Sequence, residues 1–419
     1  QPAAEENYTR HVDPKIGTGG HGHVFVGANV PFGLVQVGPT SIPQTWDWCS
    51  GYHASDSTVI GFSHTHLSGT GIGDLFDVTV MPVTGDVTYA RGEEADPASG
   101  LWSYADRTQE IARPGYYSVP LTRYGIRAEL TATARVGLHR YTFPASDAAA
   151  VVFDLENGGC WDKATETHLA KEGDRTVTGW RHSTGWAKDQ RVYFAAEFSK
   201  PFEKFETIGD NYARASFRTT DGEQVSLKVA LSPVSVEGAR ENLAAELPGW
   251  DFEETAKAAD KAWNDELSKV KIETADETAR RIFYTALYHT MIAPSLFCDV
   301  NGDYYGSDHA IHRNADFTNY TTFSLWDTYR AAMPLMTVLH PEKMADIVQT
   351  MLTISDEQGR LPVWHLWGNE TDCMVGNPGI VAVADAIVKG IGGFDREKAF
   401  EAIRKTAMNP DRGNGLRME

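Results

Sequence analysis

The chain has 419 residues, more than one hydrophobic core usually supports, so its length predicts two domains. Lys and Arg number 38 against 57 Asp and Glu, and the formal net charge of -19 disfavours binding to nucleic acid or anionic lipid, because such a surface repels phosphate. No apolar run reaches the roughly 18 residues of a membrane span, and the surface suits a neutral substrate.

Cysteine usage and the first residue bear on the compartment. The four cysteines are widely spaced and fit no zinc motif or disulfide framework. The chain begins with Gln1 rather than Met, so a leader could have been removed, and we expect a secreted or periplasmic protein. The sequence leaves the oligomeric state open.

Residues 17–23 and 61–74 are the first unusual segments. The glycine-rich run 17–23 could bind phosphate only if a helix followed it, and none is predicted there, so it is interpreted as a tight turn. His64 and His66 are two residues apart, on one side of a strand, where they could bind a metal. Since nearby acids have no ligand spacing, hydrogen bonds to backbone or substrate are the preferred alternative.

Residues 75 to about 235 contain many short runs of β-branched and aromatic residues between turn signals. This pattern predicts an antiparallel β-sandwich domain, or supersandwich, over residues 1–235. The composition then becomes rich in Ala, Glu and Lys, which predicts a helical linker over residues 236–275.

Residues 276–419 are predicted to be helical. Ile282 and Ala286 are expected on the buried stripe of one helix, and Ser324 is expected to cap a helix over 325–339, with Asp327 at its third position. Pro341 begins the next helix and Gly359 ends it. Apolar and amphipathic helices alternate as in an α/α toroid of six hairpins. The pattern stops at about half of that ring, so apolar helix faces should be left uncovered.

The carboxylates of Asp327 and Glu370 stand out because Trp326, Trp364 and Trp367 lie near them in the sequence. A glycosidase uses two such acids as general acid and base. Alternatively, Asp327 caps its helix and pairs with Arg330, while Glu370 accepts hydrogen bonds from loop amides. A third interpretation is that both bind sugar hydroxyls.

Four motifs carry a family resemblance. They are residues 31–33 (Pro-Phe-Gly), 61–71 (Gly-Phe-Ser-His-Thr-His-Leu-Ser-Gly-Thr-Gly), 324–330 (Ser-Leu-Trp-Asp-Thr-Tyr-Arg) and 368–374 (Gly-Asn-Glu-Thr-Asp-Cys-Met). Together they resemble glycoside hydrolase family 92, the calcium-dependent, inverting exo-α-mannosidases of bacteria. The resemblance runs from about His11 to the end of the chain and implies a β-sandwich joined to a helical toroid.

The resemblance also implies which residues bind the terminal mannose of an α-mannoside glycan, an N-glycan or a mannan. These are Trp48, Cys49, Asp327, Arg330, Trp367 and Glu370. The family's motifs for the catalytic acid, the base and the calcium loop do not occur here, so we expect no catalytic residue and no metal ligand in this chain. The acid, the base and most Ca²⁺ ligands are expected beyond Glu419, and the chain alone is expected to be inactive.

Two other functions stay open. One is a non-catalytic carbohydrate-binding or scaffold protein. The other is a different glycosidase, or a disaccharide phosphorylase, with the same sandwich and toroid.

Overall fold

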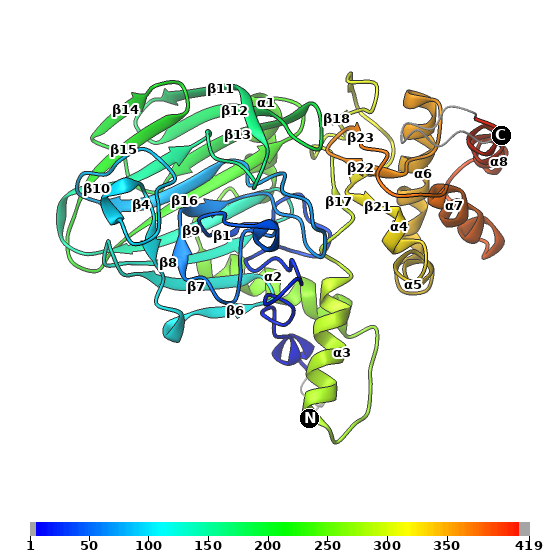
Figure 1. Cartoon of the computed structure of the whole chain (residues 1–419), viewed down its shortest axis with the longest axis horizontal. Coiled ribbons are helices and arrows are strands. Elements are labelled where there is room, and N and C mark those ends of the chain that lie inside the picture. Colours follow the sequence, from blue (N-terminus) through cyan, green and yellow to red (C-terminus); the bar gives the residue numbers. More distant parts are fainter. Residues whose placement is uncertain (1–5, 410–419) are drawn as a thin grey trace. The chain divides into compact units, whose positions relative to one another are not determined.

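The computed structural model describes residues 6–409 and divides the chain into two compact units. Gln1–Trp186 and Arg191–Ile292 make up the first unit. The second unit consists of Ala187–Gln190 and Ala293–Glu419. Figure 1 shows strands in the first unit and helices with short strands in the second.

Two large sheets form the first unit (Figure 1). The six-stranded sheet has, in spatial order, β1 (Gly38–Thr40), β3 (Gly61–Ser63), β4 (Thr79–Thr84), β10 (Ser146–Asp154), β15 (Tyr212–Thr219) and β14 (Lys204–Ile208). The eight-stranded sheet has β11 (Lys163–Glu172), β12 (Thr176–Thr184), β13 (Gln190–Phe198), β16 (Glu223–Ser232), β9 (Val136–Phe143), β8 (Ile126–Ala132), β7 (Tyr116–Leu121) and β6 (Ile111–Arg113).

Aromatic side chains from facing strands hold the two sheets together. Phe153 of β10 stacks on Phe194 of β13, with ring centroids 6.1 Å apart. The ring centroid of Phe62 of β3 lies 6.3 Å from that of Tyr141 of β9. The strand pairs of known register, such as β10 with β4 and β15, are antiparallel. The predicted antiparallel sandwich is therefore confirmed.

Histidines are part of the sandwich core. His64 Nδ1 contacts the backbone oxygen of Val78 at 2.5 Å, and His64 Nε2 lies 2.8 Å from His139 Nε2. His66 Nδ1 contacts the backbone oxygen of Gln36 at 2.8 Å. The expected backbone hydrogen bonds of His64 and His66 are thus present, and both rings are buried.

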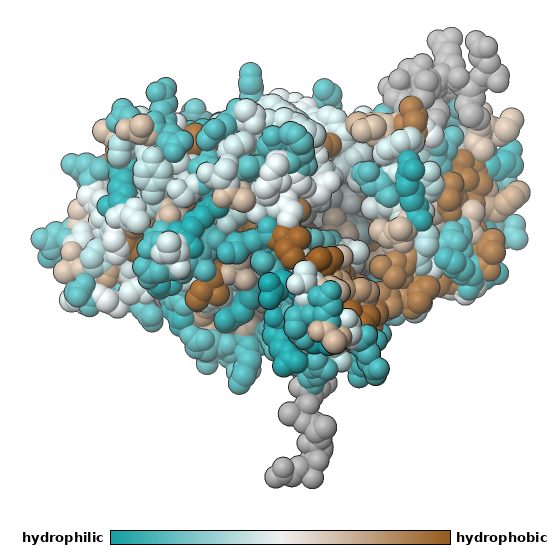
Figure 2. Space-filling view, turned by 60° about the horizontal axis from the view of Figure 1, so that its bottom comes forward, coloured by the Kyte–Doolittle hydropathy of each residue, from teal (hydrophilic) through white to brown (hydrophobic). Residues whose placement is uncertain are grey.

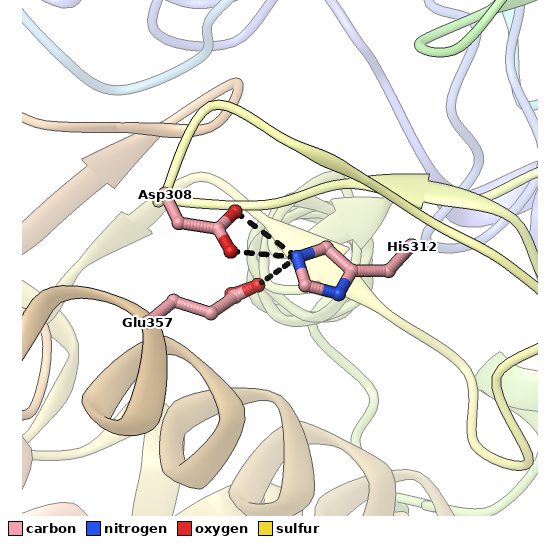
Figure 3. Close-up of side chains that lie close together, drawn as sticks. All are labelled: Asp308, His312 and Glu357. Carbon is pink, nitrogen blue, oxygen red and sulfur yellow. Dashed lines mark hydrogen bonds and ion pairs between the residues drawn. The ribbon is translucent and has the colours of Figure 1, made fainter.

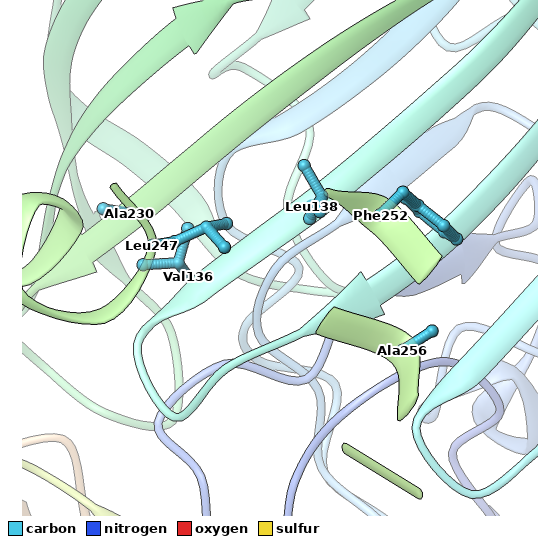
Figure 4. Close-up of a cluster of buried hydrophobic side chains, with 6 residues drawn as sticks. All are labelled: Val136, Leu138, Ala230, Leu247, Phe252 and Ala256. Carbon is cyan, nitrogen blue, oxygen red and sulfur yellow. The ribbon is translucent and has the colours of Figure 1, made fainter. Parts of the chain in front are cut away.

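Three helices follow the sheets in the first unit: α1 (Val236–Glu246), α2 (Phe252–Leu267) and α3 (Glu277–His289). Val136 and Leu138 of β9 and Ala230 of β16 form a buried cluster with Leu247, Phe252 and Ala256 (Figure 4). Residues 137, 139 and 141 alternate with this set, so α1 and α2 cover the face of β9 opposite the sandwich interior. The predicted boundaries at residues 235 and 275 stay predictions, since the compact unit runs on to Ile292.

The second unit has three small sheets and five helices among the described residues. The sheets are β17 (Ser295–Leu296) with β20 (Tyr320–Thr321), β18 (Tyr304–Tyr305) with β19 (Ile311–His312), and β21 (Phe323–Ser324) with β22 (Trp364–Leu366) and β23 (Asn369–Glu370). The helices are α4 (Leu325–Thr328), α5 (Ala332–Leu339), α6 (Pro341–Gln358), α7 (Pro378–Val388) and α8 (Arg396–Ala407). Pro341 begins α6 and Gly359 ends it with φ of 90°, as predicted.

The predicted helix over residues 325–339 is wrong, because the chain leaves the helix after α4 and begins α5 at Ala332. Pro334 accounts for the break. In one continuous helix its ring would clash with the carbonyl of residue 330, whereas the first turn of a new helix tolerates it. The predicted stripe on α3 is also wrong: Ile282 is 55% exposed, and the buried side includes Tyr284 and Tyr288.

Apolar side chains remain exposed on the helices of the second unit. They are Val338 on α5, Val381 and Val388 on α7, and Phe400 on α8, and Val388 is 85% exposed. Figure 2 shows hydrophobic residues gathered on the visible face of this unit. The expected uncovered helix faces are thus present among residues 6–409, and patches of this kind usually mark a contact surface.

The buried histidines predict how stability depends on pH. Burial lowers the pKa values of His64 and His66 to about 4, and that of His139 well below its usual value. In the unfolded chain all three take up protons near pH 6.5. The stabilising contribution of these three histidines should therefore be complete above pH 6.5 and fall towards pH 4, by roughly 3–4 kcal/mol per pH unit between pH 6 and 5. Urea unfolding at several pH values measures this slope.

Two variants check the assignment of this slope. Replacing the exposed His168 with Gln should leave the slope of stability against pH unchanged. His66→Gln should reduce the slope by the contribution of about one proton taken up on unfolding. A free energy of unfolding that stays constant between pH 6.5 and 5 would contradict the buried, neutral histidines.

Candidate active site

A three-stranded sheet joins the two aromatic motifs of the second unit. Phe323 and Ser324 of β21 pair with His365 and Trp364 of β22, and β22 pairs with β23. The motif at 324–330 and the motif at 368–374 therefore lie on the two sides of β22, which is hydrogen-bonded to both, although about forty residues of chain separate them. This sheet brings Asp327 and Glu370 onto one local framework.

Glu370 uses both carboxylate oxygens to hold the loop around it. Oε1 accepts hydrogen bonds from the Val363 amide at 2.7 Å and from Gln358 Nε2 at 3.1 Å. Oε2 accepts hydrogen bonds from the amides of Trp364 at 2.9 Å and Asp372 at 3.1 Å. Of the interpretations left open by the sequence, acceptance from loop amides is the one this geometry displays.

Asp327 lies exposed on the single turn of α4. Ser324 occupies the expected N-cap position, but its side chain caps no amide, and its Oγ donates to Asp327 Oδ2 at 2.5 Å. The expected pairing with Arg330 is absent among the described residues: the guanidinium of Arg330 lies over the rings of Trp326 and Tyr329, 4.8 and 5.1 Å from their centroids. The Asp327 carboxylate is thus held by a hydroxyl donor rather than by a cation.

Trp367 is 2% exposed, and its ring meets that of Phe297 edge-on at 5.1 Å. It has a positive φ of 47°, as do three neighbours in this region: Thr322, Asp372 and Met374. Positive φ is unfavourable for such side chains, and strain of this kind clusters at functional loops. In this chain the indole packs in the interior, and its role in binding sugar stays a prediction.

The other two predicted residues, Trp48 and Cys49, belong to the first unit. Trp48 stacks on His53 at 4.3 Å and donates to Asp56 Oδ2 at 2.8 Å. Cys49 is buried, and a hydrogen bond with Cys160, together with burial, raises the pKa of its thiol. Both cysteines are free thiols.

Three loops of the first unit meet around Trp46, beside Trp48. The Trp46 indole donates to the Gly71 carbonyl at 2.9 Å and packs edge-on against His23 at 4.2 Å. His21 Nδ1 lies 2.6 Å from Asp47 Oδ1. The glycine-rich run 17–23 is thus a turn with histidines beside an exposed indole, a surface suited to polyol contact.

Among residues 6–409, one group of three side chains has its ligand atoms close enough to hold a metal ion: Asp308, His312 and Glu357. Calcium prefers six to eight oxygen ligands, so a group with an imidazole nitrogen does not fit it. No calcium role is assigned to the described residues.

Comparison with known proteins decides the family. The model of the glycosyl hydrolase family 92 N-terminal domain matches residues 11–232, and that of the family's catalytic domain matches residues 238–418. The chain belongs to glycosyl hydrolase family 92. The resemblance carried by the four sequence motifs is confirmed.

Solved family 92 structures are similar to this chain throughout. An α-mannosidase from Bacteroides thetaiotaomicron, in complex with mannoimidazole, is 39% identical with a TM-score of 0.92, covering 96% of this chain and 56% of that protein. An inverting mannosidase from Bacteroides thetaiotaomicron VPI-5482 is 28% identical with a TM-score of 0.84. The match covers 94% of this chain and 55% of that protein.

A curated relative, a secreted glycosidase of Arthroderma benhamiae, is 26% identical over 444 residues, covering 96% of this chain and 52% of the relative. The chain thus spans little more than half the length of each of these family 92 relatives. No helix of the described part is long and apolar enough to cross a membrane.

Replacing Glu370 with Gln tests its contacts in this family 92 chain. The amide keeps the size of the side chain, but its NH₂ group cannot accept hydrogen bonds from the Trp364 and Asp372 amides. Unpaired buried donors cost about 1–3 kcal/mol each, so the second unit should lose at least ~2 kcal/mol of stability in urea unfolding. Glu401→Gln on the exposed face of α8 should cause no change, and an unchanged Glu370→Gln variant would contradict the role of these contacts.

Proposed function

We propose that this chain is part of an exo-acting α-mannosidase that hydrolyses terminal α-mannosyl linkages of N-glycans or mannans with inversion. One observation carries the proposal: 96% of the chain is covered at 39% identity by a family 92 α-mannosidase solved in complex with mannoimidazole. The similar protein described as an inverting mannosidase supports the stereochemistry.

Inversion requires one displacement. A carboxylic acid protonates the leaving oxygen while a carboxylate activates water on the opposite face of the sugar, and the two groups lie about 6.5–9.5 Å apart to admit that water. We assign neither group to residues 6–409. Glu370 is engaged by four hydrogen-bond donors, which makes it unsuited to proton transfer.

Asp327 is the better candidate for substrate contact. Its carboxylate is exposed and receives a hydrogen bond from the Ser324 hydroxyl, which leaves acceptor capacity for sugar hydroxyls. Glu370 would shape the loop beside it. Arg330 and Trp367, and in the first unit Trp48 and Cys49, are the further residues proposed to line substrate-binding surfaces.

Calcium dependence is part of the proposal, with ligands outside the described residues. Secretion is proposed as well, because the curated relative is described as a secreted glycosidase. An α/α toroid, of which the second unit would be the first part, is proposed from the predicted alternation of helices.

A second candidate is carbohydrate binding without catalysis. The amide contacts of Glu370 favour it, since they occupy one of the two carboxylates that the sequence offered as acid and base. Catalysis by a longer protein distinguishes the two functions.

The function is tested by mannose release from α-mannobiose. A protein that contains this chain and extends to the length of its family 92 relatives should release mannose, lose the activity with a chelator and regain it with calcium. The 419-residue chain alone should release none. Activity that requires phosphate but not calcium would overturn the mannosidase proposal in favour of a phosphorylase, and binding without turnover would favour the carbohydrate-binding function.

Asp327→Asn in the longer protein tests the substrate contact. Losing a hydrogen bond to a charged acceptor costs about 1.5–3 kcal/mol, so kcat/KM should fall by roughly 10- to 100-fold. Asp385→Asn on α7 is the matched control, because among the described residues the Asp385 carboxylate pairs with Lys389 one turn away, and the variant should leave kcat/KM unchanged. Unchanged KM and kcat in Asp327→Asn would exclude a role for Asp327 in substrate binding.

A further inference from the structure

The hairpin of β18 and β19 and the end of α6 bring three metal-binding side chains together (Figure 3). Asp308 lies in the turn of the hairpin, His312 ends β19, and Glu357 lies in the last turn of α6. Their ligand atoms all lie within 4.8 Å of one another. In Figure 3 the two carboxylates converge on one edge of the imidazole ring.

A single nitrogen faces three carboxylate oxygens in this cluster. His312 Nε2 lies 3.0 Å from both oxygens of Asp308 and 2.9 Å from Glu357 Oε2. An imidazole nitrogen carries at most one hydrogen, so it cannot satisfy three acceptors. The surplus of acceptors is what a bound cation would relieve.

Glu357 provides a second, independent observation. Its side chain is only 7% exposed, and Oε2 accepts no hydrogen bond from any described residue. The other oxygen receives a long hydrogen bond, 3.4 Å, from the Ser307 amide, and the Tyr304 side chain also interacts with the carboxylate. A buried carboxylate is costly unless its charge is compensated, and a bound cation would compensate it.

The backbone at Gly306 leaves room for the three ligands to meet. A Cβ atom at this position would lie 2.2 Å from Glu357 Oε2, 2.5 Å from Asp308 Oδ1 and 2.8 Å from His312 Nε2. Any larger residue would therefore displace the ligand atoms. The ring of Tyr304 stacks on that of His312, with centroids 4.9 Å apart and planes at 10°, and fixes the direction of Nε2.

We propose that Asp308, His312 and Glu357 bind a divalent transition-metal ion, with Zn²⁺ as the best fit. One imidazole nitrogen and two carboxylates are ligands that Zn²⁺ accepts, and three protein ligands leave the fourth position to water. Ligand atoms of a tetrahedral zinc site lie roughly 3.3 Å apart, so the distances from His312 Nε2 to the two carboxylates need to lengthen by only a few tenths of an ångström. The proposal does not depend on the proposed mannosidase activity.

Titration of the purified 419-residue chain with zinc chloride, followed by calorimetry, tests the site. One equivalent of Zn²⁺ should bind and raise the melting temperature, and excess Ca²⁺ should not compete. His312→Gln and Asp308→Asn should each weaken the binding at least tenfold and abolish the shift in melting temperature. Glu357→Gln should have the same effect, and Asp308→Asn, which changes a residue in an exposed turn, keeps the test valid if the variant of the buried Glu357 fails to fold.

His21→Gln is the matched control, because His21 is also an exposed histidine beside an aspartate, in the first unit. It should bind Zn²⁺ as the unmodified chain does. The proposal is overturned if the chain binds no Zn²⁺, if Ca²⁺ displaces it, or if His312→Gln and Asp308→Asn retain full affinity while His21→Gln loses it.

Discussion

The carboxylate of Glu370 is the contact on which the candidate site of the second unit depends. It gathers the amides of Val363, Trp364 and Asp372, which lie on both sides of the turn between β22 and β23. Because β22 also pairs with β21, the turn helps to position Ser324, whose hydroxyl donates a hydrogen bond to Asp327. The Glu370 carboxylate, which the sequence suggests as a catalytic acid or base, thus holds the backbone of this turn in place.

A similar use of polar groups recurs in the sandwich. His64, His66 and His139 occupy core positions where apolar residues would be expected, and each ring has a defined hydrogen-bond partner. Their neutral state is maintained by burial, so the first unit carries a built-in sensitivity to acid. In both units, these polar side chains near the family motifs form hydrogen bonds that hold the local structure in place.

The sequence was sufficient for the features that depend on local signals. Pro341 and Gly359 bound α6, and the alternating runs before residue 235 predict the sheets. Pro334, which accounts for the break between α4 and α5, is also visible in the sequence, but the predicted helix over 325–339 took only its expected cap at Ser324 into account. The amide contacts of Glu370 could not be predicted, because they depend on the turn geometry. The metal-binding cluster of Asp308, His312 and Glu357 was not predicted, because Glu357 lies on α6, 45 residues beyond His312. Its only signal in the sequence is the four-residue spacing of Asp308 and His312.

The break between α4 and α5 has an evolutionary consequence. Asp327 stands on a single helical turn whose direction comes from β21, so the packing of α5 against α6 and α7 does not set its position. Substitutions in α5 can therefore accumulate, or shift that helix, without moving the carboxylate. Relatives that diverge in α5 should then keep the geometry at this aspartate, provided that α7, which contacts α4, is retained.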